Sequence, residues 1–450
     1  MIENGSGEGI NNSSNGGNGQ RIVIRGGKRL NGTVSIGGSK NAAVALIAGA
    51  LLAASGDTVL TNVPRISDIE TLAELLCRLG ATVGFEGDGH TIRINASGLK
   101  EFAAPVDLVA RMRASFWVLG PVLARLGKAV IPQPGGCNIG ARAVDLHLKG
   151  MEALGATVES EHGAIRADAP EGGLRGANIY LDLPSVGATM NVMMAATLAD
   201  GVTVIQNAAQ EPDVENLGDL LAAMGADISG QGTGTITIRG VKALRGATFA
   251  VMPDRIEAGT FAAAAAITGG DVILQNANPA HLRAVLFKLA EMGVGVEDVP
   301  GGVRIRGKEA GRLKFTRLTA MPHPGFPTDL QQPFTSLLAL ADGTSVVTDT
   351  VYESRFHYLT ELAKLGAKIS ADGGRQAIIT GVPRFSGAIV RATDLRAGAA
   401  LIVAALAADG ETRVYDTFHV ERGYENIVGK LRGIGAEISR EDESGSPIAD

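Results

Sequence analysis

The sequence predicts an α/β fold built from repeated copies of one supersecondary unit. A tag of the form ELLCRLGATV recurs six times, each time as a helical run that ends at a glycine before a short strand. Glycine suits this place because it adopts the left-handed C-cap conformation without steric cost. The tag glycines are spaced by 75, 70, 68, 73 and 69 residues, at Gly80, Gly155, Gly225, Gly293, Gly366 and Gly435. A regular period of this kind indicates a repeated structural unit.

Each unit also contains a second helix rich in small residues. Stretches such as AAVALIAGALLAA and TFAAAAAITGG lie upstream of the tags and are followed by a turn and a strand. A helix that is apolar on all sides is buried, so we expect these helices inside, between sheets and sister helices. Strand pairs such as TITIRG separate the units. Each unit therefore has βαβαββ character.

The length of the chain favours two domains of three units with a cleft between them. A chain of 450 residues exceeds what one hydrophobic core usually serves. We expect residues 40–252 to form the first three-repeat domain, with the break near 240–252. The Gly/Asn/Ser-rich residues 1–20 are interpreted as a disordered leader, and residues 441–450 as an acidic tail.

Composition argues against several classes of protein. The formal net charge is −6, so there is no basic surface for nucleic acid or an anionic membrane. The apolar runs are shorter than a membrane span and no targeting segment is evident, which predicts a soluble, cytoplasmic protein. Two cysteines in unlike contexts favour a reducing compartment, and Cys77, within a helical apolar pattern, is expected to be buried. With no HExxH or CxxC motif, neither a metal nor a cofactor is predicted.

Polar residues gather where the first helix of each unit begins. The six entrances read GGSKNAA, RMRASFW, LPSVGAT, MPDRIEAGT, FPTDLQQ and ATDLRAGA. Serine and aspartate there are typical N-caps. Lys40, Arg113 and Arg396 cannot cap and oppose the helix dipole, so a bound anion is the economical explanation for all three. A solvated or ion-paired surface role remains the alternative for any one of them.

The loops before the tag helices form a second equivalent set. These loops contain Arg142, Arg355 and Arg422. If both sets line one cleft, six cations would face it and would suit a small, multiply anionic ligand. His147 and His323 are possible general bases, although a lone histidine is more often a structural hydrogen-bonding residue.

Taken in order, eight motifs resemble the enolpyruvyl transferase superfamily, and within it the UDP-N-acetylglucosamine 1-carboxyvinyltransferase family, over about Arg21 to Ile438. The motifs are GGSKNA, MRAS, PGGCNIGAR with VDLH, PSVGAT, PDRIEAGT, PHPGFPTD, ATDLRA and ERGYE. The resemblance implies two inside-out α/β barrel domains, each of three βαβαββ repeats. It also places residues 21–39 with 253–440 in the second domain.

The resemblance further implies a reaction. The enolpyruvyl group of phosphoenolpyruvate moves to the 3-hydroxyl of UDP-N-acetylglucosamine by addition and elimination, phosphate is released, and the product enters peptidoglycan synthesis at its first committed step. By the same resemblance, the catalytic residues are Cys137, Asp329 and Lys40. Cys137 would donate a proton to the enolpyruvyl methylene and would capture the epoxide fosfomycin. Whether it serves mainly as proton donor or mainly in product release stays open.

The motifs also assign binding residues by resemblance. Asp329 would be the base for the sugar hydroxyl. The set for phosphoenolpyruvate is Lys40, Asn41, Arg142, Arg396 and Arg422, with Arg113 as a further cation. The set for UDP-N-acetylglucosamine is Arg113, Arg142, Ala143, Val144, Asp145, Leu146, Ser185, Val186, Asp329 and Val351.

Three alternatives remain. One is 5-enolpyruvylshikimate 3-phosphate synthase, whose family has a lysine–serine pair near the N-terminus and no loop cysteine, whereas this chain has Lys40 with Asn41, and Cys137. Another is an enolpyruvyl transferase that acts on a different uridine nucleotide. The last is a repeat-built binding or scaffold protein, which would leave the cysteine and the arginines without a role. The sequence does not predict an oligomeric state.

Overall fold

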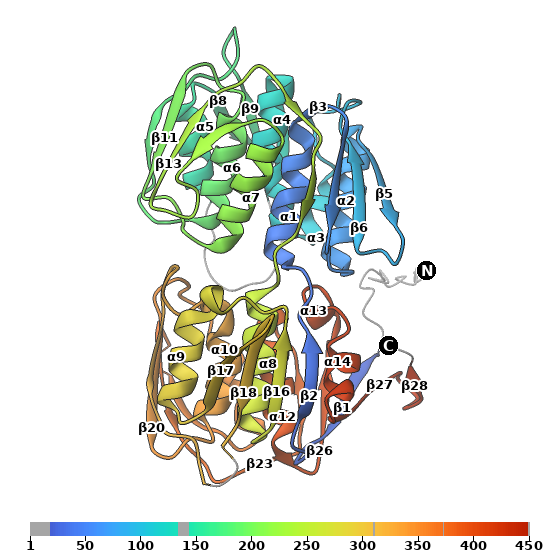
Figure 1. The fold of residues 1–450 in the computed structure, drawn as a ribbon, viewed down its shortest axis with the longest axis vertical. Helices are drawn as coiled ribbons and strands as arrows, with labels where there is room; N and C mark the ends of the chain where they lie inside the picture. Colours follow the sequence, from blue (N-terminus) through green and yellow to red (C-terminus); the bar gives the residue numbers. More distant parts are fainter. Residues whose placement is uncertain (1–18, 134–143, 309–310, 372, 449–450) are drawn as a thin grey trace, which may run out of the picture.

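Two hydrophobic clusters organise the chain, one inside each of two bodies stacked along the long axis of the molecule (Figure 1). The computed structural model describes residues 19–133, 144–308, 311–371 and 373–448. The first cluster runs from Ala42 to Met252, and the second combines Ile22 to Ile36 with Ile256 to Ile438. We call these bodies the first and the second domain.

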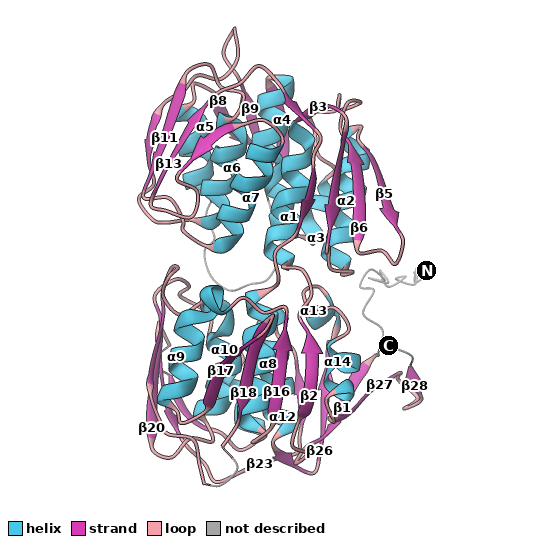
Figure 2. Ribbon diagram, in the orientation of Figure 1, coloured by secondary structure: helices cyan, strands magenta, loops and turns pink. Residues whose placement is uncertain are grey.

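The most deeply buried helices lie at the centre of each domain with the strands outside them (Figure 2). In α1 (Lys40–Gly49) every residue from Ala42 onward is buried, and in α12 (Leu395–Leu406) every residue from Arg396 onward is buried. The prediction of internal small-residue helices is therefore confirmed. Glycine, which has no side chain, allows these helices to approach each other closely. A Cβ on Gly259 of α8 (Arg255–Ile267) would come within 2.2 Å of Leu330 Cδ1 in α10 (Thr328–Leu338).

The other helices surround these, and among them α6 (Val186–Ala196) is also buried from Ala188 onward. In the first domain they are η1 (Ala50–Leu52), α2 (Ser67–Leu79), α3 (Val106–Arg111), η2 (Arg113–Val118), α4 (Leu119–Leu126), α5 (Asp145–Ala153), α6 (Val186–Ala196) and α7 (Pro212–Ala223). In the second domain they are η3 (Pro279–Leu282), α9 (Arg283–Glu291), α11 (Leu359–Lys364), α13 (Phe418–Glu421) and α14 (Ile427–Gly433). None of the helices in the described ranges is both long enough and apolar enough to cross a membrane.

The strands of the first domain form three main sheets around its helices. In order of pairing they are β15 (Thr248–Ala250), β4 (Asp57–Thr61), β6 (Thr91–Asn95) and β5 (Thr82–Glu86); β7 (Lys128–Pro132), β9 (Ala164–Asp168) and β8 (Thr157–Glu161); and β10 (Asn178–Tyr180), β11 (Val202–Gln206), β13 (Thr235–Arg239) and β12 (Asp227–Ser229). A small pair joins β14 (Leu244–Arg245) to β3 (Ala53–Ser55). The order β10, α6, β11, α7, β12, β13 is the predicted βαβαββ unit.

The second domain repeats this plan. Its sheets are β17 (Gly295–Val299), β18 (Gly302–Arg306), β16 (Asp271–Gln275) and β2 (Asn31–Ser35); β19 (Arg317–Ala320), β20 (Thr344–Asp349), β22 (Gln376–Thr380) and β21 (Lys368–Ala371); and β24 (Ile389–Arg391), β26 (Glu411–Tyr415), β1 (Arg21–Arg25), β27 (Glu437–Glu441) and β28 (Pro447–Ile448). A small pair joins β23 (Phe385–Ser386) to β25 (Ala408–Asp409).

Two chain segments connect the domains, and both lie next to helix starts. The first runs from β2, in the second domain, to Lys40 at the start of α1 (Figure 1). The second runs from β15, which pairs with β4 of the first domain, to α8 of the second. The two segments contact each other, because the Ser39 N–H donates to Met252 O at 2.7 Å and the Asp254 N–H donates to Gly37 O at 2.9 Å. Lys40 therefore lies at the boundary between the domains.

One expectation about the core is wrong. Cys77 is exposed, although its helix α2 is apolar on one face. The buried side of α2 is formed by Ile69, Leu72, Leu76 and Leu79 among others, at helical spacing. Cys77 follows Leu76 by one residue and so turns about 100° away from that face.

Candidate active site

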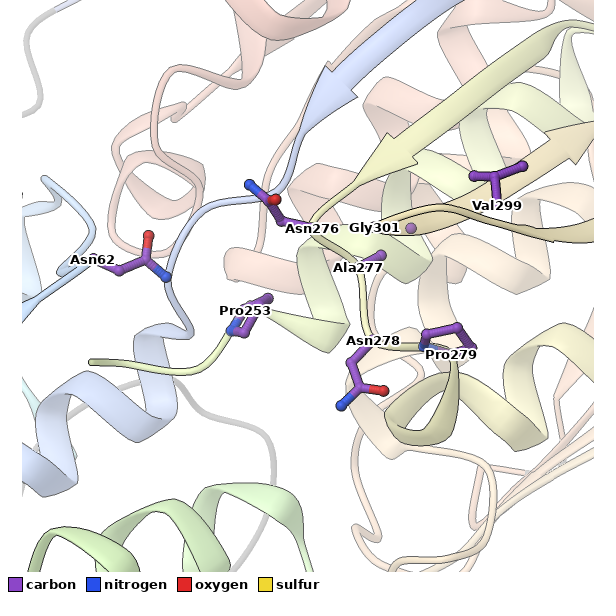
Figure 3. A pocket seen from close by; sticks show the side chains of 9 residues that line it. Asn62, Pro253, Asn276, Ala277, Asn278, Pro279, Val299 and Gly301 are labelled. Atoms are coloured by element: carbon purple, nitrogen blue, oxygen red, sulfur yellow. The ribbon is translucent and has the colours of Figure 1, made fainter. Parts of the chain in front are cut away.

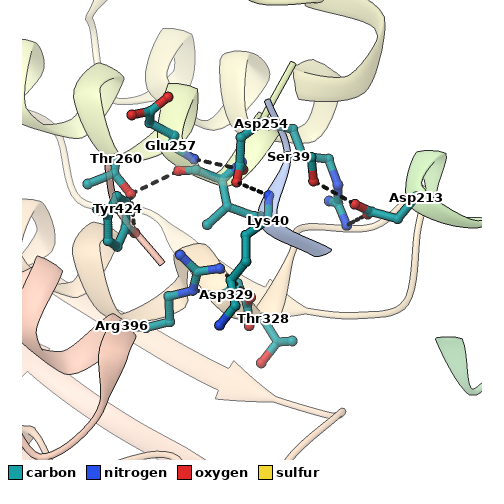
Figure 4. Close-up of polar contacts among 12 residues, drawn as sticks. Ser39, Lys40, Asp213, Asp254, Glu257, Thr260, Thr328, Asp329, Arg396 and Tyr424 are labelled. Atoms are coloured by element: carbon teal, nitrogen blue, oxygen red, sulfur yellow. Dashed lines mark hydrogen bonds and ion pairs between the residues drawn. The ribbon is translucent and has the colours of Figure 1, made fainter. Parts of the chain in front are cut away.

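Helix N-termini from both domains bring charged side chains to the domain boundary. Lys40 is the first residue of α1, Asp329 the second of α10 and Arg396 the second of α12. Asp254 caps α8 and also accepts the Lys40 backbone N–H at 3.1 Å. Lys40, Asp329 and Arg396 lie close to one another in Figure 4. The equivalent ends of different repeats thus build one polar centre.

The first group of charges surrounds Asp329 and lies entirely in the second domain. Arg355 Nη2 donates to Asp329 Oδ1 at 2.7 Å, and Arg396 donates to Oδ2 from Nη2 at 3.0 Å and from Nε at 3.2 Å. The side chains of Arg355 and Arg396 are 3% and 4% exposed, whereas that of Asp329 is 24% exposed. We call these three residues the Asp329 cluster. Its carboxylate is held by two guanidinium groups while one side stays open to solvent.

The Asp329 cluster is supported by a hydrogen-bond chain behind it. Arg355 Nη1 donates to Thr328 Oγ1 at 2.7 Å, and Thr328 Oγ1 donates to Asp349 Oδ2 at 2.6 Å. Asp349 Oδ1 accepts the backbone N–H of Val351 at 2.9 Å. The predicted sugar neighbour Val351 is therefore fixed to the same network as the predicted base Asp329.

Arg396 is also held by aromatic and hydroxyl groups. Its guanidinium lies 5.2 Å from the centre of the Tyr424 ring, and the Tyr424 and Thr260 hydroxyls are 2.8 Å apart. Burial alone would lower the pKa of Arg396, but Tyr424, Asp329 and Asp254 raise it above its ordinary value. Arg396 is therefore a fixed cation beneath the site.

A second group of charges joins the two domains. Asp68 lies in the first turn of α2. Its Oδ2 forms an ion pair with Lys40 Nζ at 2.7 Å, and its Oδ1 accepts a hydrogen bond from Arg422 Nε at 2.8 Å. Lys40 and Asp68 belong to the first domain and Arg422 to the second. We call these three residues the Asp68 cluster. Burial is the main cause that lowers the pKa of Lys40, and the charge of Arg396 lowers it further, which links the two clusters electrostatically.

Arg113 lies elsewhere in the first domain, beside a buried histidine. Burial, and then the charge of Arg113, lower the pKa of His147 to about 3. Asn191 Nδ2 lies 3.0 Å from His147 Nδ1 and also donates to Phe116 O at 3.2 Å. His147 is therefore neutral and structural, since it ties α5 to the segment that carries Arg113, and the geometry gives no support for a general base there.

Apart from Arg113, the predicted site residues that the structure describes fall into two groups in space. Lys40, Asp329, Arg396 and Arg422 come together at the domain boundary, with Val351 connected to them and half-buried Asn41 next to Lys40 on α1. A second group lies at the starts of α5 and α6, which pack together in the first domain: Val144, Asp145, Leu146, Ser185 and Val186. Cys137, Arg142 and Ala143 lie outside the described residues.

Sequence reasoning missed Asp68, one of the two carboxylates that organise this centre. Asp68 lies in the loop NVPRISD, which belongs to the same set as the loops of Arg355 and Arg422, but only cations of that set were predicted to face the cleft. Asp394 does cap α12, by accepting the N–H groups of Arg396 at 2.8 Å and Ala397 at 3.0 Å. A search for carboxylates among the repeat-equivalent cations would have found Asp68.

Other contacts across the boundary are also polar. Ser39 Oγ donates to Asp213 Oδ1 at 2.9 Å, and Arg255 Nη2 lies 3.5 Å from Asp213 Oδ2. The His323 N–H donates to Glu211 Oε1 at 3.2 Å, and burial, then Arg255 and His281, lower the pKa of the His323 ring to about 4. The domains therefore meet through charges and hydrogen bonds, as expected of surfaces that also separate.

A pocket of about 540 Å³ lies to one side of this centre, where the connecting segments meet the second domain (Figure 3). Its lining is formed by Asn62, Pro253, Asn276, Ala277, Asn278, Pro279, Val299, Gly301 and Gly302. It contains no residue of either charge cluster. In the described ranges, no group of three or more histidine, cysteine, aspartate or glutamate side chains is arranged to hold a metal.

Comparison with known proteins identifies the family of the chain. The family model described as EPSP synthase (3-phosphoshikimate 1-carboxyvinyltransferase) matches residues 24–431. UDP-N-acetylglucosamine 1-carboxyvinyltransferase 3 of Caldanaerobacter subterraneus subsp. tengcongensis is 52% identical over 421 residues, 94% of this chain and 99% of that protein. UDP-N-acetylglucosamine 1-carboxyvinyltransferase 1 of Halalkalibacterium halodurans is 49% identical over 94% of each chain.

Solved structures share the fold. The enolpyruvyl transferase NikO from Streptomyces tendae superposes with a TM-score of 0.83 at 27% identity, over 96% of this chain and 100% of that one. An EPSP synthase from Acinetobacter baumannii has a TM-score of 0.71 at 22% identity, over 94% and 100%. The fold and these relatives together define an enolpyruvyl transferase. The chain belongs to the EPSP synthase family, and within it to the proteins named UDP-N-acetylglucosamine 1-carboxyvinyltransferases.

Proposed function

We propose that this enzyme transfers the enolpyruvyl group of phosphoenolpyruvate to the 3-hydroxyl of UDP-N-acetylglucosamine and releases phosphate, as the first committed step of peptidoglycan synthesis. The observation that carries this function is the similarity over nearly the full length to relatives of that name, at about half identity. The cationic centre at the domain boundary suits a donor that carries both phosphate and carboxylate.

The two charge clusters suggest a division of labour. Lys40, Arg396 and Arg422 are the described cations that would hold the anionic groups of phosphoenolpyruvate, and Arg142 would join them. Asp329 would accept the proton of the sugar hydroxyl. A carboxylate between two guanidinium groups is a weak base in isolation, so its contribution rests on placement within hydrogen-bond reach of the hydroxyl. The open side of Asp329 leaves room for that approach.

The starts of α5 and α6 would hold the nucleotide of UDP-N-acetylglucosamine. Ser185 caps α6 by accepting the Ala188 N–H at 3.3 Å, and the N-termini of both helices carry the positive end of the helix dipole. The diphosphate of the acceptor would lie near these ends, with Arg113 as a neighbouring cation. The cytoplasm is the compartment we expect for this reaction.

A phosphate-release assay with a panel of acceptors tests the function. We expect release from phosphoenolpyruvate with UDP-N-acetylglucosamine and none without an acceptor. Turnover only with shikimate 3-phosphate would reassign the enzyme to its other family branch. Turnover only with another uridine nucleotide would keep the class and change the substrate. Binding without turnover of any acceptor would favour a non-enzymatic role.

The role of Cys137 needs a separate test, because that residue lies outside the described range. We expect fosfomycin to add one adduct to the intact protein, and peptide mapping to place it on Cys137. The exposed Cys77 provides the matched control: Cys77→Ser should keep the adduct, and Cys137→Ser should lose it together with most of the turnover. An adduct on Cys77 would refute the assignment.

A further inference from the structure

One carboxylate of the first domain holds a cation from each domain. Asp68 is 3% exposed, and its two oxygens are divided between Lys40 and Arg422, at 2.7 and 2.8 Å. Lys40 and Arg422 are both predicted to bind the phosphoenolpyruvate anions. A buried carboxylate with a single partner on each oxygen orients both partners.

We propose that Asp68 is a positioning residue for phosphoenolpyruvate, whose carboxylate sets the Lys40 ammonium and the Arg422 guanidinium side by side when the domains are together. This inference rests on the proposed function. Asp68 would not contact the reacting atoms itself. It would act through the two cations, one of which reaches the site only from the second domain.

The need for such a carboxylate follows from the charges that face Lys40. Arg396 on α12 and Arg422 after α13 are both cations, and Asp254 at the start of α8 contacts only its backbone N–H. Burial and these two arginines lower the pKa of Lys40, while Asp68 is the group that raises it. Removal of the carboxylate would therefore leave Lys40 closer to losing its proton.

Asp68 does not use up the donors of its partners. The Lys40 ammonium has three N–H groups, and one of them faces Asp68 Oδ2. Arg422 meets Asp68 through Nε, and a guanidinium carries four further N–H groups on its two Nη atoms. Asp68 therefore orients each of the two cations through a single N–H group.

The test compares Asp68→Asn with Glu70→Gln. Glu70 lies in the same first turn of α2 but is exposed, so its variant removes an equal charge from the same helix end without touching the cluster. We expect Asp68→Asn to raise the KM for phosphoenolpyruvate by about tenfold or more, with kcat reduced much less. The loss in kcat/KM should grow as the pH rises from about 6 to about 9, because Lys40 deprotonates more readily. Asp68→Glu should recover part of the loss.

The outcomes separate cleanly. If wild-type enzyme gives no turnover with UDP-N-acetylglucosamine, the proposed function fails. If it turns over, an Asp68→Asn enzyme with an unchanged or lowered KM, or a defect that is flat with pH, overturns the positioning role. Asp68→Ser is measured in parallel, since serine is well tolerated near a helix start, and a melting curve establishes that each variant is folded.

Discussion

The Asp329 cluster and the Asp68 cluster use the same elements in different ways. Each places one carboxylate between two cations. The members of the Asp329 cluster all come from the second domain, and its arginines are almost fully buried. The Asp68 cluster needs both domains, and its Arg422 side chain is 21% exposed. The first is assembled by folding of one domain, whereas the second exists only while the domains meet. A reaction step that requires bound substrate can therefore be coupled to closure of the two domains, because closure brings Arg422 to Asp68.

The largest expected effect breaks the Asp329 cluster. Asp329→Asn keeps the shape and the hydrogen-bond acceptor but removes the base, so we expect kcat to fall by about a thousandfold, within the range of general base catalysis. The KM for phosphoenolpyruvate should change less than in Asp68→Asn. Phosphate release under saturating substrates is the measurement.

Asp342→Asn is the control for Asp329→Asn, because Asp342 is 79% exposed and pairs with Arg312 at the surface. A kcat for Asp329→Asn within about threefold of this control would contradict the role of base. A defect confined to KM would move Asp329 into the binding set and would remove the distinction between the clusters.

A second prediction concerns stability and sharpens the idea that the Asp329 cluster is preassembled. Arg355→Met removes a buried guanidinium that holds both Asp329 and Thr328. We expect a loss of about 3 kcal/mol, at the lower end for breaking a buried ion pair, since Asp329 keeps Arg396. Thermal unfolding followed by calorimetry checks this expectation in the absence of substrate.

Arg384→Met is the matched control for Arg355→Met, because the Arg384 side chain is 77% exposed and pairs with Asp409 at 3.4 Å. An exposed pair of this kind contributes about 0.5 kcal/mol or less. Equal melting temperatures for the two variants would show that the cluster is not part of the folded framework of the second domain.

Prediction from sequence succeeded where the repeat carried the information. The period of the tags defined the unit and the class of fold, and the equivalence of the helix starts selected Lys40 and Arg396, which the structure brings together at the domain boundary. It failed at Asp68, because the function of that carboxylate depends on Arg422, which lies 354 residues away in the other domain. It failed at Cys77 because the helical apolar pattern was not used to decide whether Cys77 lies on the buried or the exposed face of its helix. Local patterns determine which side chains stand at helix ends, whereas the contacts between domains determine which of them are paired.

The smallest expected effect concerns another contact across the domains. His90, before β6, lies with Nε2 2.7 Å from Glu425 Oε1 in the second domain. Burial lowers the pKa of His90, but Glu425 and Asp88 outweigh it and raise the pKa above its ordinary value. The pair therefore stabilises the contact fully at pH values below the ordinary histidine pKa and loses this contribution as the pH rises through the raised value.

Glu425→Gln tests this contribution against Glu437→Gln, whose partner Arg25 does not titrate near neutrality. The His90 side chain is 39% exposed, so solvent screening limits the effect to a few tenths of a kcal/mol. Small-angle scattering and melting curves at about pH 6 and about pH 8 should show a smaller pH difference in Glu425→Gln than in Glu437→Gln. If both variants keep the wild-type pH difference, protonation of His90 does not contribute to domain contact, and among the described contacts closure depends on the Asp68 cluster and the other polar pairs at the boundary.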